Sequence, residues 1–352
     1  METIMKLLSV FVTIFTLFSS MFGWFRTGYA PLDADNLKMS AVLISDTHIS
    51  TKTTDAQNVL ERGVRDMSKS KSAADMLMIT GDLTDNGLTD QYDALFNIIN
   101  KRSPAKKAVC VMGNHDAWAV DYLNNFKSKY NAATLSSITE AYYKYSVNGY
   151  TVLAMGTEKG FQESEDYRNE AYLSEAQLNW LDSQLASAFL LSDKPVFVMC
   201  HQPINGTNRQ AEAWSLGGLG AQSDQLLAIL KKHADAGHTV IICSGHLHNS
   251  IGYAGVTNQG NLWFVDVPSF GVEPSRGDNR TTGTGYVVEC YPGKVILRAR
   301  DFTGAAFMED FVYTITTTEK VTPVTPEQPT EPVTPTEPVT TPEPITAPPL
   351  ID

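Results

Sequence analysis

Cysteine is scarce in this chain, and its few occurrences form no metal-binding pair. The 352 residues contain four cysteines, and no two of them are separated by only two residues. This spacing excludes a Cys-x-x-Cys zinc site and the dense disulfide framework of a small stapled domain. Every cysteine lies in an apolar run, which predicts buried thiols, with pairing in an exported protein as the alternative; the four are Cys110, Cys200, Cys243 and Cys290.

Basic residues are too few to offset the acidic ones. The chain has 27 lysines and arginines against 39 aspartates and glutamates, a formal net charge of −12. Part of this charge lies in the C-terminal tail, so the folded part is less acidic than the total. Because no basic stripe is present, no long nucleic acid is expected as a partner. The hydrophobic content of 43% is ample for a large core.

The N-terminal segment, residues 1–30, has the composition of an export signal. Residues 7–22 are largely apolar, Lys6 precedes them, and the segment ends in Gly-Tyr-Ala, a small-x-small cleavage pattern. Glu2 and Pro31 fit a cleaved signal peptide less well, so an uncleaved N-terminal anchor is the alternative. Both interpretations place the rest of the chain outside the cytoplasm, secreted or associated with the cell surface.

The C-terminal segment, residues 318–352, repeats Thr-Pro, Glu-Pro and Val-Thr pairs and has no aromatic residue. It contains too much proline for a helix or a sheet, which predicts a disordered, polyproline-like spacer. In exported proteins such spacers commonly hold a domain away from a surface, so association with the cell surface or cell wall is expected. The remaining residues, 31–317, are expected to form one domain.

Strand-like runs alternate with helical patterns in the first part of this domain. Apolar runs at residues 39–45, 75–80 and 108–112 are separated by helical patterns at 58–68 and 92–100. This alternation predicts crossover units and a mostly parallel core sheet, which is an α/β fold.

The second part of the domain is expected to complete the sheets. Asn148-Gly149 predicts a hairpin between strands at 142–147 and 150–155. Ser174 is positioned to cap a helix over residues 173–185. The other expected elements are strands at 195–200 and 239–243, a helix at 223–233, and antiparallel closing strands at 262–267, 286–290, 294–298 and 311–315.

Five of the strand-like runs end in side chains that bind metals. One such motif alone is commoner in a surface loop, but five together indicate a functional site. Carboxylates, amide oxygens and imidazoles are ligands of Mn²⁺, Fe and Zn²⁺, and strand carboxyl ends converge on one edge of a sheet. Five of the chain's seven histidines belong to this set, which comprises Asp46, His48, Asp82, Asn114, His115, His201, His246 and His248.

The order of these motifs resembles the calcineurin-like metallophosphoesterase superfamily. The signature of that superfamily is Asp-x-His, Gly-Asp, Gly-Asn-His-(Asp/Glu), a histidine and Gly-His-x-His, and each motif has a counterpart between Asp46 and His248. The resemblance covers residues 39–317. It implies a four-layer αββα sandwich of two mixed β-sheets flanked by helices, with two divalent metal ions (Mn, Fe or Zn) that share a carboxylate.

The resemblance also implies a role for each motif residue. Asp46, His48, Asp82 and His248 would hold one metal ion, and Asp82, Asn114, His201 and His246 would hold the other. A small phosphodiester, or a phosphomonoester, would be hydrolysed by attack of a metal-bridging hydroxide. His115 would stabilise the transition state or protonate the leaving oxygen. Asp116 would orient His115, with capping of the next helix as its alternative role.

Two further observations bear on the branch and the substrate. The purple acid phosphatases place a tyrosine three residues after the bridging aspartate, where this chain has Asp85. Residues 81–87 instead resemble the bacterial cyclic-nucleotide-phosphodiesterase-like branch, which favours a phosphodiesterase over a phosphomonoesterase. In the loop over residues 205–220, Arg209 and Trp214 are substrate-binding candidates, for a phosphate and a base respectively, although loop packing is the commoner role.

The sequence therefore predicts an exported dinuclear-metal phosphoesterase. The alternative is a surface-tethered binding or structural protein with a vestigial metal site. His115 argues against that alternative, because a vestigial site has no chemical reason to keep an acid that is not a ligand. The natural substrate does not follow from the fold.

Overall fold

The computed structural model describes residues 28–71, 73–213 and 217–318. Most of the expected N-terminal segment (1–30) and of the expected spacer (318–352) lies outside these residues, so both stay predictions. Within the described part of the chain, no helix is both long and apolar enough to cross a membrane.

Two six-stranded mixed sheets form the centre of the domain. In the first sheet, the order is β12-β11-β10-β1-β2-β3, with β1, β2 and β3 parallel and the other three strands antiparallel. Its strands are β1 (Met39–Ile44), β2 (Met76–Ile79), β3 (Ala108–Cys110), β10 (Thr284–Tyr291), β11 (Lys294–Asp301) and β12 (Ala306–Thr316).

The second sheet has the order β4-β5-β6-β7-β9-β8. Its strands are β4 (Tyr142–Val147), β5 (Tyr150–Met155), β6 (Val196–Cys200), β7 (Val240–Ser244), β8 (Val256–Gln259) and β9 (Leu262–Asp266). The hairpin β4–β5 has the predicted bounds. The prediction that residues 262–267 form an antiparallel closing strand is only partly confirmed, because β9 pairs antiparallel with β8 but parallel with β7.

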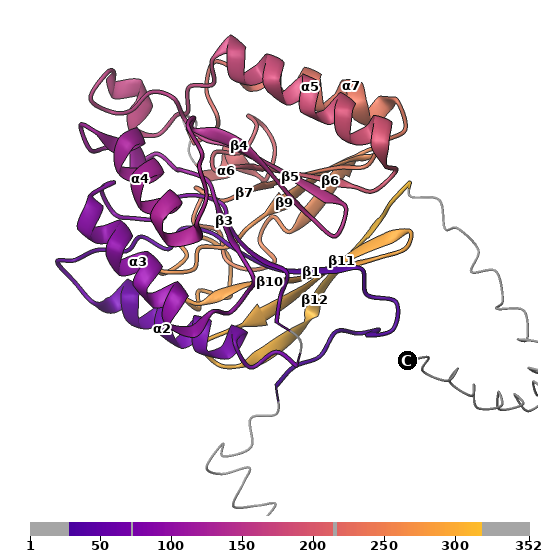
Figure 1. Ribbon diagram of the computed structural model, residues 1–352, viewed down its shortest axis with the longest axis horizontal. Helices are drawn as coiled ribbons and strands as arrows, with labels where there is room; N and C mark the ends of the chain where they lie inside the picture. The colour runs from indigo at the N-terminus through magenta and orange to yellow at the C-terminus, as the bar shows by residue number, and fades with distance from the viewer. Residues whose placement is uncertain (1–27, 72, 214–216, 319–352) are drawn as a thin grey trace, which may run out of the picture. The chain divides into compact units, whose positions relative to one another are not determined.

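Helices cover the outer face of each sheet (Figure 1). The first sheet packs against α2 (Asp55–Met67), α3 (Thr89–Arg102) and α4 (Tyr122–Thr134), and the second against α5 (Glu175–Leu191) and α7 (Ser223–Asp235). Short turns complete the described elements: η1 (His115–Ala117), η2 (Glu165–Arg168) and α6 (Gln210–Ala213). Ser174 caps α5 as predicted, since its hydroxyl accepts from the backbone N–H of Gln177.

Three apolar layers separate the two sheets and their helices. In β1, Met39, Ala41 and Leu43 face the second sheet, whereas Val42 and Ile44 pack with the helices of the first. This two-residue alternation is the pleat of a strand that is buried on both faces. Burying each large side chain contributes about 1.5–3 kcal/mol to folding. The predicted four-layer αββα sandwich is confirmed.

The cysteines are structural members of these layers. All four are buried, and none of them forms a disulfide. Burial raises the pKa of the Cys200 and Cys243 thiols to about 12, so neither is a reactive thiolate at neutral pH. The predicted burial of the thiols is therefore confirmed.

The start of the described chain packs on the first sheet. Arg298 donates from Nη1 to the carbonyl oxygen of Ala30 at 3.2 Å. The guanidinium of Arg300 lies 4.3 Å from the ring centroid of Tyr29 and also forms a two-bonded pair with Asp66 of α2. The packing of the domain thus includes Tyr29 and Ala30, which precede its predicted start at residue 31.

Candidate metal centre

The carboxyl ends of β1, β2, β3, β6 and β7 bring the predicted ligands together. Among the groups whose donor atoms all lie within 4.8 Å of one another, two share Asp82. The first group is Asp46, His48, Asp82 and His248, and the second is Asp82, His201 and His246. These are the two sets implied by the motif order, apart from Asn114, whose amide is described below.

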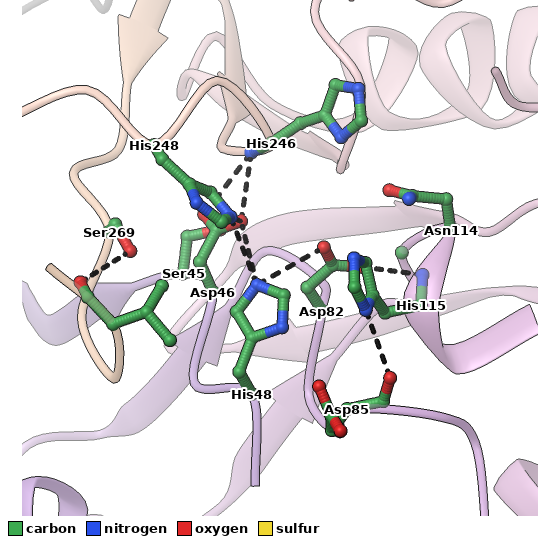
Figure 2. A network of polar contacts seen from close by, with 12 residues as sticks. Ser45, Asp46, His48, Asp82, Asp85, Asn114, His115, His246, His248 and Ser269 are labelled. Carbon is green, nitrogen blue, oxygen red and sulfur yellow. Dashed lines mark hydrogen bonds and ion pairs between the residues drawn. The ribbon is translucent and has the colours of Figure 1, made fainter. Parts of the chain in front are cut away.

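In the first group, four donor atoms lie close together, one from each residue (Figure 2). The Nε2 atoms of His48 and His248 lie 3.0 Å apart. His248 Nε2 lies 3.3 Å from Asp46 Oδ1, and His48 Nε2 lies 3.5 Å from Asp82 Oδ2. These spacings suit a small cation surrounded by imidazole and carboxylate donors.

In the second group, main-chain carbonyls fix the orientation of the donors. His201 donates from Nδ1 to the carbonyl of Thr80 at 2.7 Å, which leaves Nε2 to face Asp82 Oδ2 at 3.2 Å. Asn114 donates from Nδ2 to the carbonyl of Arg168 at 2.8 Å, and its buried Oδ1 has no hydrogen-bond partner. A buried amide oxygen without a donor is costly, so this atom fits a cation ligand.

The backbone at this edge adopts an unusual conformation. Five of the eleven non-glycine residues with positive φ in the described part of the chain belong to the two groups. Their φ angles run from 42° to 70°, in the left-handed region that a Cβ disfavours; they are Asp46, His48, Asp82, His246 and His248. Such residues cluster where the surrounding structure holds a functional geometry.

Hydrogen bonds between the strand-end loops hold this conformation. Asp46 and His48 donate their backbone N–H groups to the carbonyls of Gly81 and Asp82, at 3.0 and 2.9 Å. The backbone N–H of His246, from the second sheet, donates to both oxygens of Asp46 at 3.2 Å. Gly113 fits only because it lacks a side chain, since a Cβ there would clash with Asp82. The site therefore connects the two sheets.

The protonation states suit metal ligation. Burial lowers the pKa of His48 to about 4 and that of His246 to about 3, so both rings keep a lone pair at neutral pH. Burial opposes ionisation of Asp46, but His248 and His201 outweigh it and lower the pKa of that carboxyl to about 2. Burial also disfavours the cationic form of His201, yet Asp82 raises its pKa to about 9, so a cation entering the site would displace a proton.

Comparison with known proteins agrees with this geometry. Residues 39–250 match the family model described as calcineurin-like phosphoesterase. The chain belongs to the calcineurin-like phosphoesterase family. Over 186 residues it is 26% identical to a 3',5'-cyclic-nucleotide phosphodiesterase of Nostoc sp., covering 49% of this chain and 56% of that protein. Over 213 residues it is 27% identical to a probable glycerophosphodiester phosphodiesterase of Arcobacter nitrofigilis, covering 55% of this chain and 71% of that protein.

A solved structure supports the fold of this family member. The purple acid phosphatase of yellow lupin (Lupinus luteus) superposes with a TM-score of 0.54 at 14% identity, covering 79% of this chain and 53% of that chain. Such a likeness concerns the fold alone. The family match and the sequence relatives confirm the predicted superfamily and its bacterial branch. The solved structure supports the sandwich architecture.

The hydrogen-bond partner of the His115 ring is not the predicted Asp116. Asp116 does not orient the ring; its buried carboxylate accepts hydrogen bonds from Gly113, Leu83, Thr84 and Tyr92. It thus joins the loop after β2 to the loop after β3. The His115 ring instead donates from Nδ1 to the carbonyl oxygen of Asp85 at 3.0 Å. His115 itself lies at the site, where its backbone N–H donates to Asp82 Oδ1 at 2.9 Å (Figure 2).

The two predicted substrate contacts receive no support from the structure. The exposed guanidinium of Arg209 bonds to Glu212 through Nε and Nη2 and to the carbonyl of Tyr253 through Nη1. It also stacks over the Tyr253 ring at 4.0 Å, so loop packing accounts for its donors. Trp214 lies outside the described residues.

Three groups at the site were missed by the sequence analysis. The carbonyls of Asp85 and Arg168 contact His115 and Asn114, and a main-chain carbonyl leaves no mark in the sequence. The third is Trp118, whose ring stacks on His115 with centroids 3.8 Å apart. Its position three residues after His115 was the available indication, because residues so spaced share one face of a helical turn.

Proposed function

We propose that this protein is a dinuclear-metal phosphoesterase that prefers phosphodiesters. The observation that carries the proposal is the pair of ligand groups that share the Asp82 carboxylate. The buried, ionised Asp82 is a suitable bridge. Burial opposes ionisation of its carboxyl, but His201 and His115 outweigh this effect and hold its pKa well below the usual range. The phosphodiesterases named among the relatives favour a small diester as substrate.

The donor set fits two divalent ions such as Mn²⁺, Fe or Zn²⁺. Such ions, when bound, would hold phosphate oxygens and activate a water molecule for attack. Asp46, His48, Asp82 and His248 are the proposed ligands of one ion, and Asp82, Asn114, His201 and His246 those of the other.

His115 is the proposed general acid of the reaction. Its Nδ1–H is held by the Asp85 carbonyl, which leaves Nε2 to protonate the departing oxygen. The ring is half-buried and lies edge-to-face against His48, a proposed ligand, with centroids 4.6 Å apart. It is therefore close enough to the cluster to reach a phosphate held there.

The activity is tested by hydrolysis of 4-nitrophenyl phosphate and bis(4-nitrophenyl) phosphate by the purified protein with added Mn²⁺. Faster turnover of the diester is expected, and cyclic nucleotides and glycerophosphodiesters are the next substrates to compare. Faster turnover of the monoester would contradict the diester preference. A purified protein that binds no transition metal would overturn the proposal and favour the alternative of a surface-tethered binding or structural protein.

We further propose that the protein is exported and associated with the cell surface through its tail. The apolar residues 7–22 and the Thr/Pro/Glu-rich residues 318–352 support this location. Fractionation of the source cells is the test, with an antibody against the domain. Recovery of the protein in the cytoplasmic fraction alone would contradict export.

A further inference from the structure

Trp118 covers one face of the proposed catalytic histidine. The turn η1 is a 3₁₀ turn, closed by a hydrogen bond from the Trp118 N–H to the His115 carbonyl at 3.2 Å. Side chains three residues apart eclipse in such a turn. The indole therefore lies over the imidazole, with an interplanar angle of 30° and a centroid separation of 3.8 Å.

The indole is itself held by the carbonyl oxygen of Arg168. Trp118 donates from Nε1 to this oxygen at 3.2 Å, and Asn114 donates from Nδ2 to the same oxygen at 2.8 Å. One carbonyl, with its two lone pairs, thus connects the ring beside His115 with the side chain of a proposed metal ligand. Arg168 ends η2 in the segment between β5 and α5, and its guanidinium lies 4.0 Å from the Phe161 ring and pairs with Glu165.

The other contacts of the imidazole restrain it only in part, so the Trp118 indole is needed to fix its orientation. The Asp85 carbonyl holds Nδ1, and the ring meets His48 edge-to-face at 86°. His115 is only half-buried, so the protein core does not enclose the ring. Without the indole, one hydrogen bond and one edge contact would be left to restrain rotation of the imidazole about its side-chain bonds. Proton transfer to a leaving oxygen depends steeply on such orientation.

We propose that Trp118 is a positioning residue for the reaction, which orients the His115 ring for proton transfer and shares with Asn114 the Arg168 carbonyl. The inference rests on the proposed function. Trp118 acts on the step in which the leaving oxygen takes up a proton, and the indole contributes no ligand. Its removal therefore affects turnover more than substrate binding, and more strongly for a poor leaving group than for a good one.

The kinetic test compares Trp118→Leu and Trp118→Phe with the unaltered protein. The probes are methyl 4-nitrophenyl phosphate and methyl phenyl phosphate. The weakly basic 4-nitrophenolate departs with little need for a proton, whereas departure of the more basic phenolate depends on proton transfer. Trp118→Leu is expected to lower kcat for the phenyl ester by about 10–100-fold, with a smaller fall for the nitrophenyl ester and little change in KM. Trp118→Phe keeps an aromatic face and is expected to recover most of this loss. Metal content should be unchanged in both variants.

Trp180→Leu is the matched control for loss of an indole. Trp180 lies on α5, where its ring packs on Tyr142 at 5.0 Å. This variant should leave the ratio of kcat for the two esters unchanged. The proposal is overturned if Trp118→Leu loads metal and keeps the unaltered kcat for the phenyl ester. Equal losses on both esters, accompanied by a lower melting temperature, would show a merely structural role and overturn it too.

A second readout does not depend on turnover. In the protein loaded with diamagnetic Zn²⁺ and labelled with ¹³C at the histidine Cε1, the His115 signal is assigned by its loss in His115→Asn. A single sharp signal is expected in the unaltered protein and in Trp118→Phe, and a broadened or split one in Trp118→Leu. A sharp single signal in Trp118→Leu overturns the proposal. If the unaltered protein binds metal but hydrolyses neither ester, the proposed function fails while this measurement still decides the role of Trp118.

Discussion

The Nε2 atoms of His48 and His248 face each other across 3.0 Å. They come from different sheets, since His48 follows β1 and His248 follows β7. Two protonated rings would repel at this distance, and burial already lowers the pKa of His48 to about 4. At least one of the two Nε2 atoms therefore directs a lone pair at the other ring. A cation bound by both rings would stabilise this arrangement.

Metal stoichiometry follows from the way the two groups overlap. His248→Ala and His246→Ala each remove a ligand from one group only, so each is expected to lower the metal content from about two ions per chain towards one. Asp82→Ala removes the shared carboxylate and is expected to weaken binding of both ions. Elemental analysis after dialysis measures the content. His233→Ala, on α7 and paired with Asp182, is the control that should keep both ions.

Removal of His115 separates chemistry from metal binding. His115→Ala is expected to keep the metal content and to lower kcat by about 10²–10⁴-fold, which is the usual contribution of a general acid. Steady-state kinetics on the aryl diester, with metal analysis of the same sample, measures both quantities. Unchanged turnover would refute the assigned role of His115.

The buried pair Asp66–Arg300 stabilises the contact between α2 and the first sheet. Its two hydrogen bonds, of 2.7 and 3.0 Å, join α2 to β11. Asp66→Ala leaves the guanidinium buried without its counter-charge and is expected to lower the free energy of unfolding by about 3–5 kcal/mol. Urea denaturation measures this change. The double variant Asp66→Leu with Arg300→Met should recover most of the loss, and a double variant as unstable as the single one would contradict this explanation.

The carboxyl of Asp266 gives stability a specific pH dependence. Burial, and to a lesser extent the charge of Asp46, raises its pKa to about 8, although both oxygens accept from Asn249. In the unfolded chain the group ionises near pH 4, at about 3.9. Ionisation therefore favours unfolding. Between about pH 4 and pH 8 it lowers the free energy of unfolding by at most about 1.4 kcal/mol per pH unit.

Asp266→Asn removes this ionisation and keeps an oxygen that accepts from Asn249. Its melting temperature, relative to that of the unaltered protein, is expected to be higher at pH 8 than at pH 5. Thermal denaturation across this range measures the difference. A difference that does not change with pH would show that Asp266 is ionised in the folded state.

The sequence predicted most of the fold because local patterns encode it. The apolar runs located the strands, and Asn148-Gly149 set the β4–β5 hairpin. Helix α4 was missed because its apolar stripe is only three aromatic residues in a polar segment: Tyr122, Phe126 and Tyr130. Strand β8 was missed because three of its four residues are exposed, and the direction of β9 depends on pairing between segments distant in sequence.

The positions of the candidate metal-binding side chains were predictable for a related reason. Each lies at the end of a strand, so finding the strands also placed the side chains at one edge. The orientation of His115 was not predictable, because the group that holds it is the main-chain carbonyl of Asp85. Asp116 was misassigned since three of its donors are backbone N–H groups, which side-chain identity does not reveal.

The left-handed backbone of the site has a consequence for how such a protein can change over generations. Glycine adopts positive φ without the steric cost of a Cβ, so at each of the five positions, from Asp46 to His248, a change to glycine would relax the main chain while deleting a donor atom. Loss of the candidate metal centre is therefore favoured by backbone energetics. The five side chains able to bind a cation are present here in spite of that cost, and each of them lowers the free energy of unfolding.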